Sequence, residues 1–157
     1  AVKAISPSTK VIGVEPEGVD VMRRSLLSGS LVEIDEPGVD GIWVRRLGPE
    51  VFRVCDELVD EVITVSNREI AQAIRDAFED TRALLEPSGA TSIAGLSKWL
   101  SRPSNNRSSL PHGGSYVAVA SDACNIEFDL LQQFASDPAF VDVSGMLARS
   151  SPPAPES

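Results

Sequence analysis

Polar residues able to bind or react directly follow three apolar runs of this sequence. The three junctions are KVIGV-EP (10–16), EVITV-SN (61–67) and YVAVA-SDACN (116–125). They offer carboxylates, hydroxyls and amides, the groups that hold a small polar ligand or move its protons. Shared chemistry requires a fold that brings these junctions to one place.

The apolar runs before the junctions are predicted to be buried strands, because each is short and rich in β-branched or other apolar residues. A further short strand is expected at 31–34. Strands that alternate with helices indicate an α/β fold, with a parallel sheet flanked by helices. Ligands in such sheets bind beyond the carboxyl ends of the strands, which is where the junctions lie.

Helical spacing of apolar residues predicts the layers that cover the sheet. One helix is expected at 18–27, where Val19, Met22, Leu26 and Leu27 recur and Gly29 stops the helix. Another is expected at 49–58, with Pro49 in its first turn. Further helices are predicted around 93–100 and after Asn125.

The longest helix is predicted to begin at Ser66, which forms an S-x-x-E capping box with Glu69. Its buried face is expected to carry five apolar residues, and Pro87 is expected to end it. These residues are Ile70, Ile74, Ala77, Phe78 and Leu85.

Composition and charge restrict the partners. The 157 residues carry 23 acidic and 14 basic side chains, a net charge of -9, which opposes phosphate backbones and anionic lipids. No apolar run approaches the roughly 18 residues of a membrane span. We therefore expect a soluble intracellular protein with neither a nucleic acid nor a membrane partner. Its cysteines, Cys55 and Cys124, have no CxxC spacing and are expected to be reduced.

Four segments carry a resemblance: VIGVEPEG (11–18), FRVCDELVDEVITVSNREI (52–70), FEDTRALLEPSGATSIAGLSKWL (78–100) and SDACNIEFD (121–129). In this order and spacing they resemble the biosynthetic threonine ammonia-lyases (threonine dehydratases), a family of fold-type II pyridoxal-phosphate enzymes. The combination of FEDTR and LEPSGA favours these enzymes over the serine racemases.

The resemblance implies that residues 1–140 form part of the large domain of the tryptophan synthase β-like fold. Residues 102–114 are expected to be a surface loop, and 144–157 a disordered tail. The complete enzyme would use pyridoxal 5'-phosphate to convert L-threonine to 2-oxobutanoate and ammonia, the first step of isoleucine biosynthesis. Family members are homo-oligomers of the bacterial cytoplasm, or of mitochondria and plastids.

By the resemblance, Ser121 donates a hydrogen bond to the pyridine nitrogen of the cofactor. A neutral hydroxyl cannot hold a proton there as a carboxylate would, which favours β-elimination of water. The alternative is a serine that only caps the next helix. Asn125 matches the family asparagine if one residue is inserted after Ala123. Asp122 stands where the family has glycine.

Two further cofactor contacts are implied, at Gly41 through its backbone and at Glu86. Trp43 replaces a small residue of the family, unless it is simply a core or interface aromatic. As a sequence feature alone, Glu86 is equally consistent with a charged residue in the last turn of a helix before Pro87. Glu15 matches a metal-ligand glutamate of the related serine racemases, but Val21 stands where they have aspartate, so no metal site is predicted.

The lysine that anchors the cofactor and the glycine-rich loop that holds its phosphate have no counterpart in these residues. Lys3, Lys10 and Lys98 fit surface or helix positions. We therefore expect a fragment that is inactive alone, and the opening AVKAIS resembles the end of a helix. A degenerate, non-catalytic homologue used for binding or oligomerisation is the alternative. An unrelated α/β ligand-binding domain is disfavoured, because no G-x-G-x-x-G motif occurs.

Overall fold

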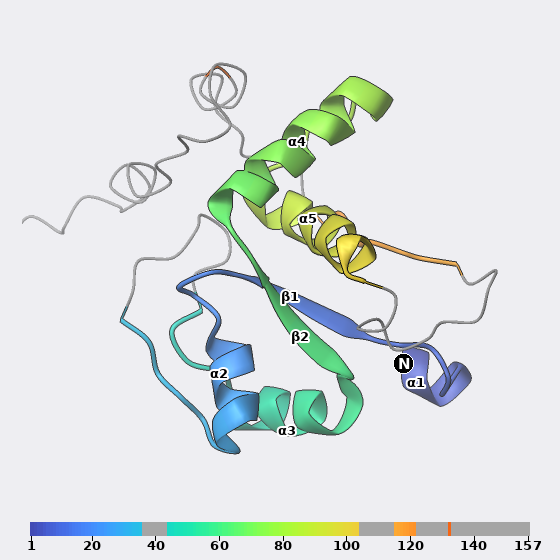
Figure 1. Ribbon diagram of the computed structural model, residues 1–157. Coiled ribbons are helices and arrows are strands. Elements are labelled where there is room, and N and C mark those ends of the chain that lie inside the picture. The colour runs from blue at the N-terminus through green and yellow to red at the C-terminus, as the bar shows by residue number, and fades with distance from the viewer. Residues whose placement is uncertain (36–43, 104–114, 122–131, 133–157) are drawn as a thin grey trace, which may run out of the picture.

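The computed structural model of the chain describes residues 1–35, 44–103, 115–121 and 132. Two parallel strands lie between two groups of helices, with α4 and α5 on one side and α2 and α3 on the other (Figure 1). This arrangement confirms the predicted α/β class. The elements are α1 (Val2–Ile5), β1 (Ile12–Pro16), α2 (Val21–Ser28), α3 (Pro49–Leu58), β2 (Glu61–Val65), α4 (Asn67–Thr81) and α5 (Pro87–Ser101).

The sheet pairs β1 with β2 in parallel, from Ile12 opposite Glu61 to Pro16 opposite Val65. The second strand has its predicted bounds, whereas the first begins two residues later than expected. Just before β1, the N–H of Val11 donates to the Asp60 carboxylate at 2.8 Å, and the carbonyl oxygen of Val11 accepts the N–H of Asp60 at 2.9 Å. A backbone N–H that donates to a side chain is not available to a strand ladder.

The helix α2 starts at Val21 rather than at residue 18, and it ends as predicted at Gly29, whose φ of 65° lies in the left-handed region that favours glycine. Its buried positions are Val21 and Ser25. Leu27, expected on the buried face, is 74% exposed, so that assignment was wrong. The helix α3 has its predicted bounds.

The capping box at the start of α4 is confirmed: Ser66 accepts from the N–H of Glu69, and the Glu69 side chain accepts from the N–H of Ser66. The predicted extent of the helix was wrong. It ends at Thr81, and Arg82 takes a left-handed conformation with φ of 63°. Leu85 is buried but lies beyond the helix, and Phe78 is half-exposed. Pro87 begins α5 instead of ending α4, because proline fits the first turn of a helix.

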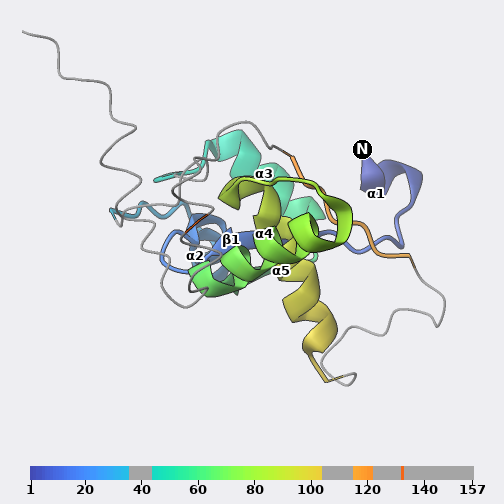
Figure 2. The ribbon, with the colours of Figure 1, turned by 90° about the horizontal axis from the view of Figure 1, so that it is seen from above.

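The main core lies between α4, α5 and β2. Its buried members are Val65, Ile70, Ala71, Ala73, Ile74, Leu85, Ala90 and Ala94. Several are alanines, which allow the two helices and the strand to approach closely. Seen from above, α4 and α5 cross over the strands (Figure 2). None of the helices in the described residues is long and apolar enough to cross a membrane.

The strand predicted at 116–120 is absent. These residues belong to no strand, and Val117 and Val119 are 84% and 70% exposed. An apolar run becomes a buried strand only where another strand pairs with it and a layer covers it. Neither occurs here within the described residues. In place of the short strand expected at 31–34, a single antiparallel bridge joins Glu33 to Arg46.

Three other expectations fall outside the described residues. They are the body of the predicted loop (104–114), the helix after Asn125 and the predicted tail (144–157).

Candidate functional site

The carboxyl ends of β1 and β2 meet, as the parallel pairing requires. The N–H of Glu17, just after β1, donates to the carbonyl oxygen of Val65 at 2.8 Å and extends the ladder by one bond. Two of the three polar junctions, those after Pro16 and Val65, therefore lie side by side.

A lysine of α5, Lys98, forms ion pairs with residues that follow both strands. Lys98 Nζ lies 2.9 Å from Glu69 Oε2 and 3.7 Å from Glu17 Oε1. The same Glu69 oxygen accepts the backbone N–H of Ser66 at 2.7 Å. Burial acts to raise the pKa of Glu69, but the Ser66 N–H and the Lys98 ammonium outweigh it, so the pKa is lowered. Lys98 is thus a charged structural partner.

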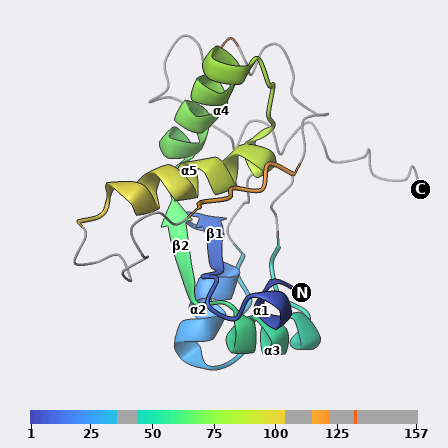
Figure 3. The same cartoon turned by 90° about the vertical axis from the view of Figure 1, so that its right-hand side faces the viewer.

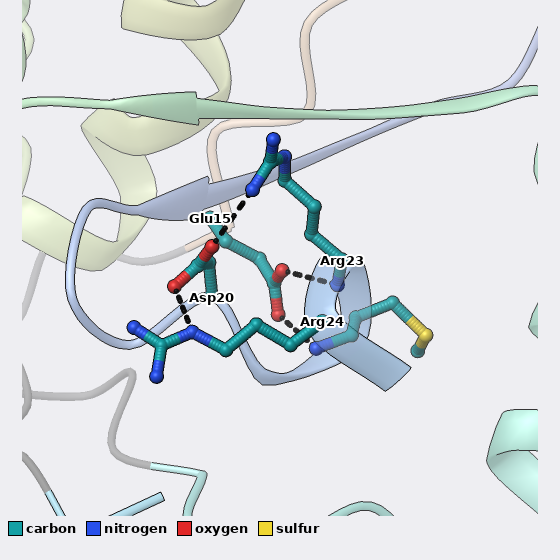
Figure 4. Close-up of polar contacts among 5 residues, drawn as sticks. Glu15, Asp20, Arg23 and Arg24 are labelled. Carbon is teal, nitrogen blue, oxygen red and sulfur yellow. Dashed lines mark hydrogen bonds and ion pairs between the residues drawn. The ribbon is translucent and has the colours of Figure 1, made fainter. Parts of the chain in front are cut away.

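Glu15, on β1, caps the neighbouring helix. Its two carboxylate oxygens accept the backbone N–H groups of Met22 and Arg23, each at 2.9 Å (Figure 4). Those donors belong to the first turn of α2 and would otherwise lack helical acceptors. Burial raises the pKa of Glu15 against the effect of these two bonds, and the nearby charge of Asp20 raises it further.

Asp20 occupies the N-cap position of α2 but does not cap it. Its buried carboxylate instead binds two arginines, Arg24 Nε at 2.8 Å and Arg23 Nη1 at 3.3 Å (Figure 4). Glu15 thus binds backbone N–H groups of α2, whereas Asp20 binds two of its side chains. No group of three metal-ligating side chains occurs in the part of the chain that the structure describes.

Glu86 is the N-cap residue of α5. Its side chain is buried and does not cap the helix. Instead, the hydroxyl of Ser88 donates to Glu86 Oε1. The carboxylate is therefore held in one orientation within the first turn of α5.

The third junction reaches α5 through the segment 115–121, which is bound to the helix at two places. The rings of Tyr116 and Trp99 are 6.1 Å apart, and Ser92 Oγ donates to the carbonyl oxygen of Val119 at 2.7 Å. Since Tyr116 pairs with the later helix residue, the segment runs antiparallel to α5 (Figure 3).

The spacing of these two contacts places Ser121. The helix rises roughly 10 Å between Ser92 and Trp99, and three extended residues span roughly 10 Å, so the contacts agree in register. Two more extended residues add roughly one helical turn. An extended course from Val119 would therefore bring Ser121 level with the first turn of α5, beside which Glu86 and Ser88 lie.

Of the four predicted cofactor contacts, Ser121 and Glu86 lie within the described residues, and Ser121 follows the segment that runs along α5 toward the end where Glu86 lies. Gly41 and Asn125 lie outside the described residues, as do Trp43 and Asp122. Sequence analysis missed Ser88 and Ser92. The E-P-S spacing could have indicated the first, whereas the partner of Ser92 is 27 residues away and left no sequence signal.

Each of the three lysines forms an ion pair with one or more carboxylates. Lys3 Nζ lies 2.6 Å and Lys10 Nζ 3.3 Å from Asp60, near the start of β2, and Lys98 binds Glu69 and Glu17 at the opposite end of the sheet.

Comparison with known proteins decides the family. A family model described as "Pyridoxal-phosphate dependent enzyme" matches residues 1–122. The chain belongs to this family. Its members depend on pyridoxal phosphate, as expected from the resemblance.

Curated proteins similar to this chain include threonine dehydratases, which confirms the resemblance. The biosynthetic L-threonine dehydratase of Pasteurella multocida is 44% identical over 101 residues, covering 63% of this chain and 20% of its own length. That of Burkholderia multivorans is 42% identical over 133 residues, 83% of this chain and 25% of its own. The mitochondrial threonine dehydratase of Saccharomyces cerevisiae is 39% identical over 87% of this chain and 23% of its own. The chain thus spans between a fifth and a quarter of these relatives.

Solved structures support the same family assignment. The processed form of threonine deaminase isoform 2 from Solanum lycopersicum superimposes with a TM-score of 0.74 at 33% identity, over 92% of this chain and 37% of that one. Maize serine racemase gives a TM-score of 0.70 at 28% identity, over 85% of this chain and 41% of its own.

Proposed function

We propose that this chain forms part of the catalytic domain of a pyridoxal-phosphate-dependent threonine ammonia-lyase, with residues 1–140 as its share of that domain. The observation that carries the proposal is the antiparallel course of 115–121 along α5, fixed by Ser92 and Trp99. This course supports a position of Ser121 near the end of α5 where Glu86 lies, and we propose that these two residues, predicted from separate motifs, share one site.

Bound pyridoxal phosphate supplies an electron sink for the electrons released at the α-carbon of an amino acid. Ser121 is exposed at the end of the segment, so its hydroxyl is accessible to donate a hydrogen bond to the pyridine nitrogen. Glu86 presents a carboxylate whose orientation Ser88 fixes. We assign Gly41 and Asn125 to the same site from their motifs alone.

The contacts of the three lysines support a site whose anchoring lysine lies outside these 157 residues. Each is engaged by carboxylates, and an ammonium held in this way is a poor nucleophile. We infer that none of them anchors the cofactor and that the 157 residues do not deaminate threonine alone. The proposal therefore treats the chain as a fragment whose activity needs the anchoring lysine and phosphate loop of the rest of the domain.

The substrate we propose is L-threonine, with 2-oxobutanoate and ammonia as products and isoleucine biosynthesis as the pathway. The biosynthetic names of the bacterial relatives support it. We also propose that the complete enzyme is a homo-oligomer, and that it works in the bacterial cytoplasm or in an organelle.

The direct test is to titrate the purified chain with pyridoxal phosphate, reduce it with borohydride and look for modified lysines by mass spectrometry. We expect reversible binding that Ser121→Ala weakens, no lysine adduct and no 2-oxobutanoate from threonine. A stoichiometric adduct on Lys3, Lys10 or Lys98 would contradict the proposal, and so would an affinity that Ser121→Ala leaves unchanged.

A second candidate is a non-catalytic homologue that binds or assembles with other chains. It is favoured by Asp122, which brings a negative charge next to Ser121, and by Trp43, which is large for its place in the family motif. The two candidates differ in one outcome: Asp122→Gly should strengthen cofactor binding markedly only if the present site is degenerate.

A further inference from the structure

Ser92 forms an unusual hydrogen bond for a serine within a helix. Its hydroxyl lies 2.7 Å from the carbonyl oxygen of Val119 and 3.4 Å from that of Gly89, in its own helix. One hydroxyl proton serves one strong bond, and 2.7 Å is the normal O–H···O distance while 3.4 Å is too long. The bond to Val119 is therefore the stronger of the two.

Other hydroxyls of α5 behave differently. Thr91 donates to the carbonyl of Pro87 at 2.8 Å, and Ser101 to that of Ser97 at 2.9 Å, each one turn back in the same helix. Such bonds are local and common for serine and threonine in helices. Of these three hydroxyls, only that of Ser92 bonds to a residue outside α5.

Within the described residues, two contacts with α5 hold the segment that includes Val119. Residues 115–121 form no strand, and Val117 and Val119 point largely into solvent. The other contact with α5 is the ring pair of Tyr116 and Trp99, five residues before Ser121. The Ser92 bond, in contrast, holds the carbonyl only two residues before Ser121, so it controls how far that hydroxyl can move.

We propose that Ser92 is a positioning residue, which sets the register of 115–121 on α5 and thereby places Ser121 at the first turn of that helix. The role of Ser121 as a hydrogen-bond donor to the cofactor rests on the proposed function. The effect of Ser92 on the register of 115–121 is independent of the proposed function.

Three variants of the full chain separate this role from general stability. Ser92→Ala removes the hydroxyl while keeping a strong helix former, so α5 should persist. Ser92→Thr keeps a hydroxyl and should restore the bond. Ser101→Ala removes a hydroxyl that bonds only within the same helix, and serves as the matched control.

The readout is NMR of the segment itself: the carbonyl ¹³C shift of Val119 and the heteronuclear NOE of the amides at 118–121. In Ser92→Ala we expect the Val119 shift to change and the NOE values to fall. A hydrogen bond of this kind changes the detached population roughly two- to tenfold. Ser92→Thr and Ser101→Ala should match the wild type. An unchanged Val119 shift and NOE in Ser92→Ala would overturn the proposal.

Pyridoxal phosphate affinity, measured on the same variants and on Ser121→Ala, distinguishes this inference from the proposed function. If both hold, Ser92→Ala and Ser121→Ala both weaken binding, whereas Ser101→Ala does not. If the segment loosens in Ser92→Ala but neither variant alters the affinity, the positioning role stands and the assignment of Ser121 to the cofactor fails.

Discussion

Gly95 of α5 packs against Val14 of β1 so closely that a methyl group on the glycine would lie 2.4 Å from Val14 Cγ2 and 2.6 Å from Cγ1. Real side chains do not approach to that distance, so either α5 or the strand would have to move. This contact sets the separation between the helix that carries Glu86 and the sheet beneath it.

Replacing Gly95 by alanine should therefore destabilise the chain. Overpacking of this kind costs about 1 to 3 kcal/mol, against a gain of about 1 kcal/mol from the better helix propensity of alanine. In a Val14→Ala background the two closest carbons are gone and only Cβ, at 3.1 Å, remains near, so the same change should cost much less. Urea unfolding of the four combinations gives the coupling. Equal effects of Gly95→Ala in the two backgrounds would show that the contact is not tight.

The capping box of α4 should contribute measurably to stability. Ser66→Ala removes the acceptor of the Glu69 N–H and should lower the free energy of unfolding by about 1 kcal/mol. Ser66→Thr should retain most of it. Ser101→Ala, at the end of α5, is the control and should change stability by less than about 0.5 kcal/mol. Urea titrations compare them, and equal losses in Ser66→Ala and Ser101→Ala would contradict the role of the cap.

Asp60 should make stability depend on pH in the acid range. Bonds from the Lys3 ammonium, the Val11 N–H and the Lys10 ammonium lower the pKa of Asp60 from 3.8 to about 2. Because the folded pKa is depressed, its contribution is complete above pH 3.8 and is lost as the pH falls toward 2. Asp60→Asn should therefore be less stable than the wild type at neutral pH, with a difference that shrinks in that window.

A matched control for Asp60 is Glu50→Gln, which removes an ion pair with Arg53 on the exposed surface of α3. Pairs of that kind contribute little, so its unfolding curve should stay close to that of the wild type at every pH. A difference between Asp60→Asn and the wild type that does not vary with pH would count against the assigned bonds.

The thiol of Cys55 should react slowly. Burial raises the pKa of Cys55, and the negative charge of Glu15 raises it further. In a Cys124→Ser background, Glu15→Gln should therefore speed alkylation by iodoacetamide at mildly alkaline pH, by roughly two- to fivefold. Glu57→Gln makes the same change of net charge on the helix that carries Cys55, and it should leave the rate unaltered. Equal acceleration by both variants would mean that net charge, not Glu15, controls the thiol.

Local signals predicted much of the fold. The capping box, Pro49 in a first turn and Gly29 at a helix end each depend on residues close in sequence, and these predictions were confirmed. The same periodicity misled where α4 was extended to Leu85. That residue is buried as expected, but a left-handed Arg82 interrupts the helix before it, and arginine is not a usual signal for such a stop.

Interactions between distant residues were not predictable from pattern. The apolar run at 116–120 indicated a strand because apolar residues are usually covered, yet its fixed contacts are with side chains of α5. Glu15 was considered as a junction carboxylate and as a possible metal ligand, since nothing in the sequence shows that its oxygens reach two N–H groups seven and eight residues later. For Ser121 and Glu86, the motifs named the residues and the packing of α5 supplies the argument that they lie together.

The central claim is that this chain supplies a working part of a threonine ammonia-lyase site. It is tested most directly by replacing the matching 133 residues of the Burkholderia multivorans enzyme with this chain and assaying a folded, cofactor-loaded chimaera for 2-oxobutanoate. We predict deamination of threonine that Ser121→Ala reduces on the order of a hundredfold. A folded, cofactor-loaded chimaera that does not deaminate threonine, or one in which Ser121→Ala has no effect, would contradict the claim.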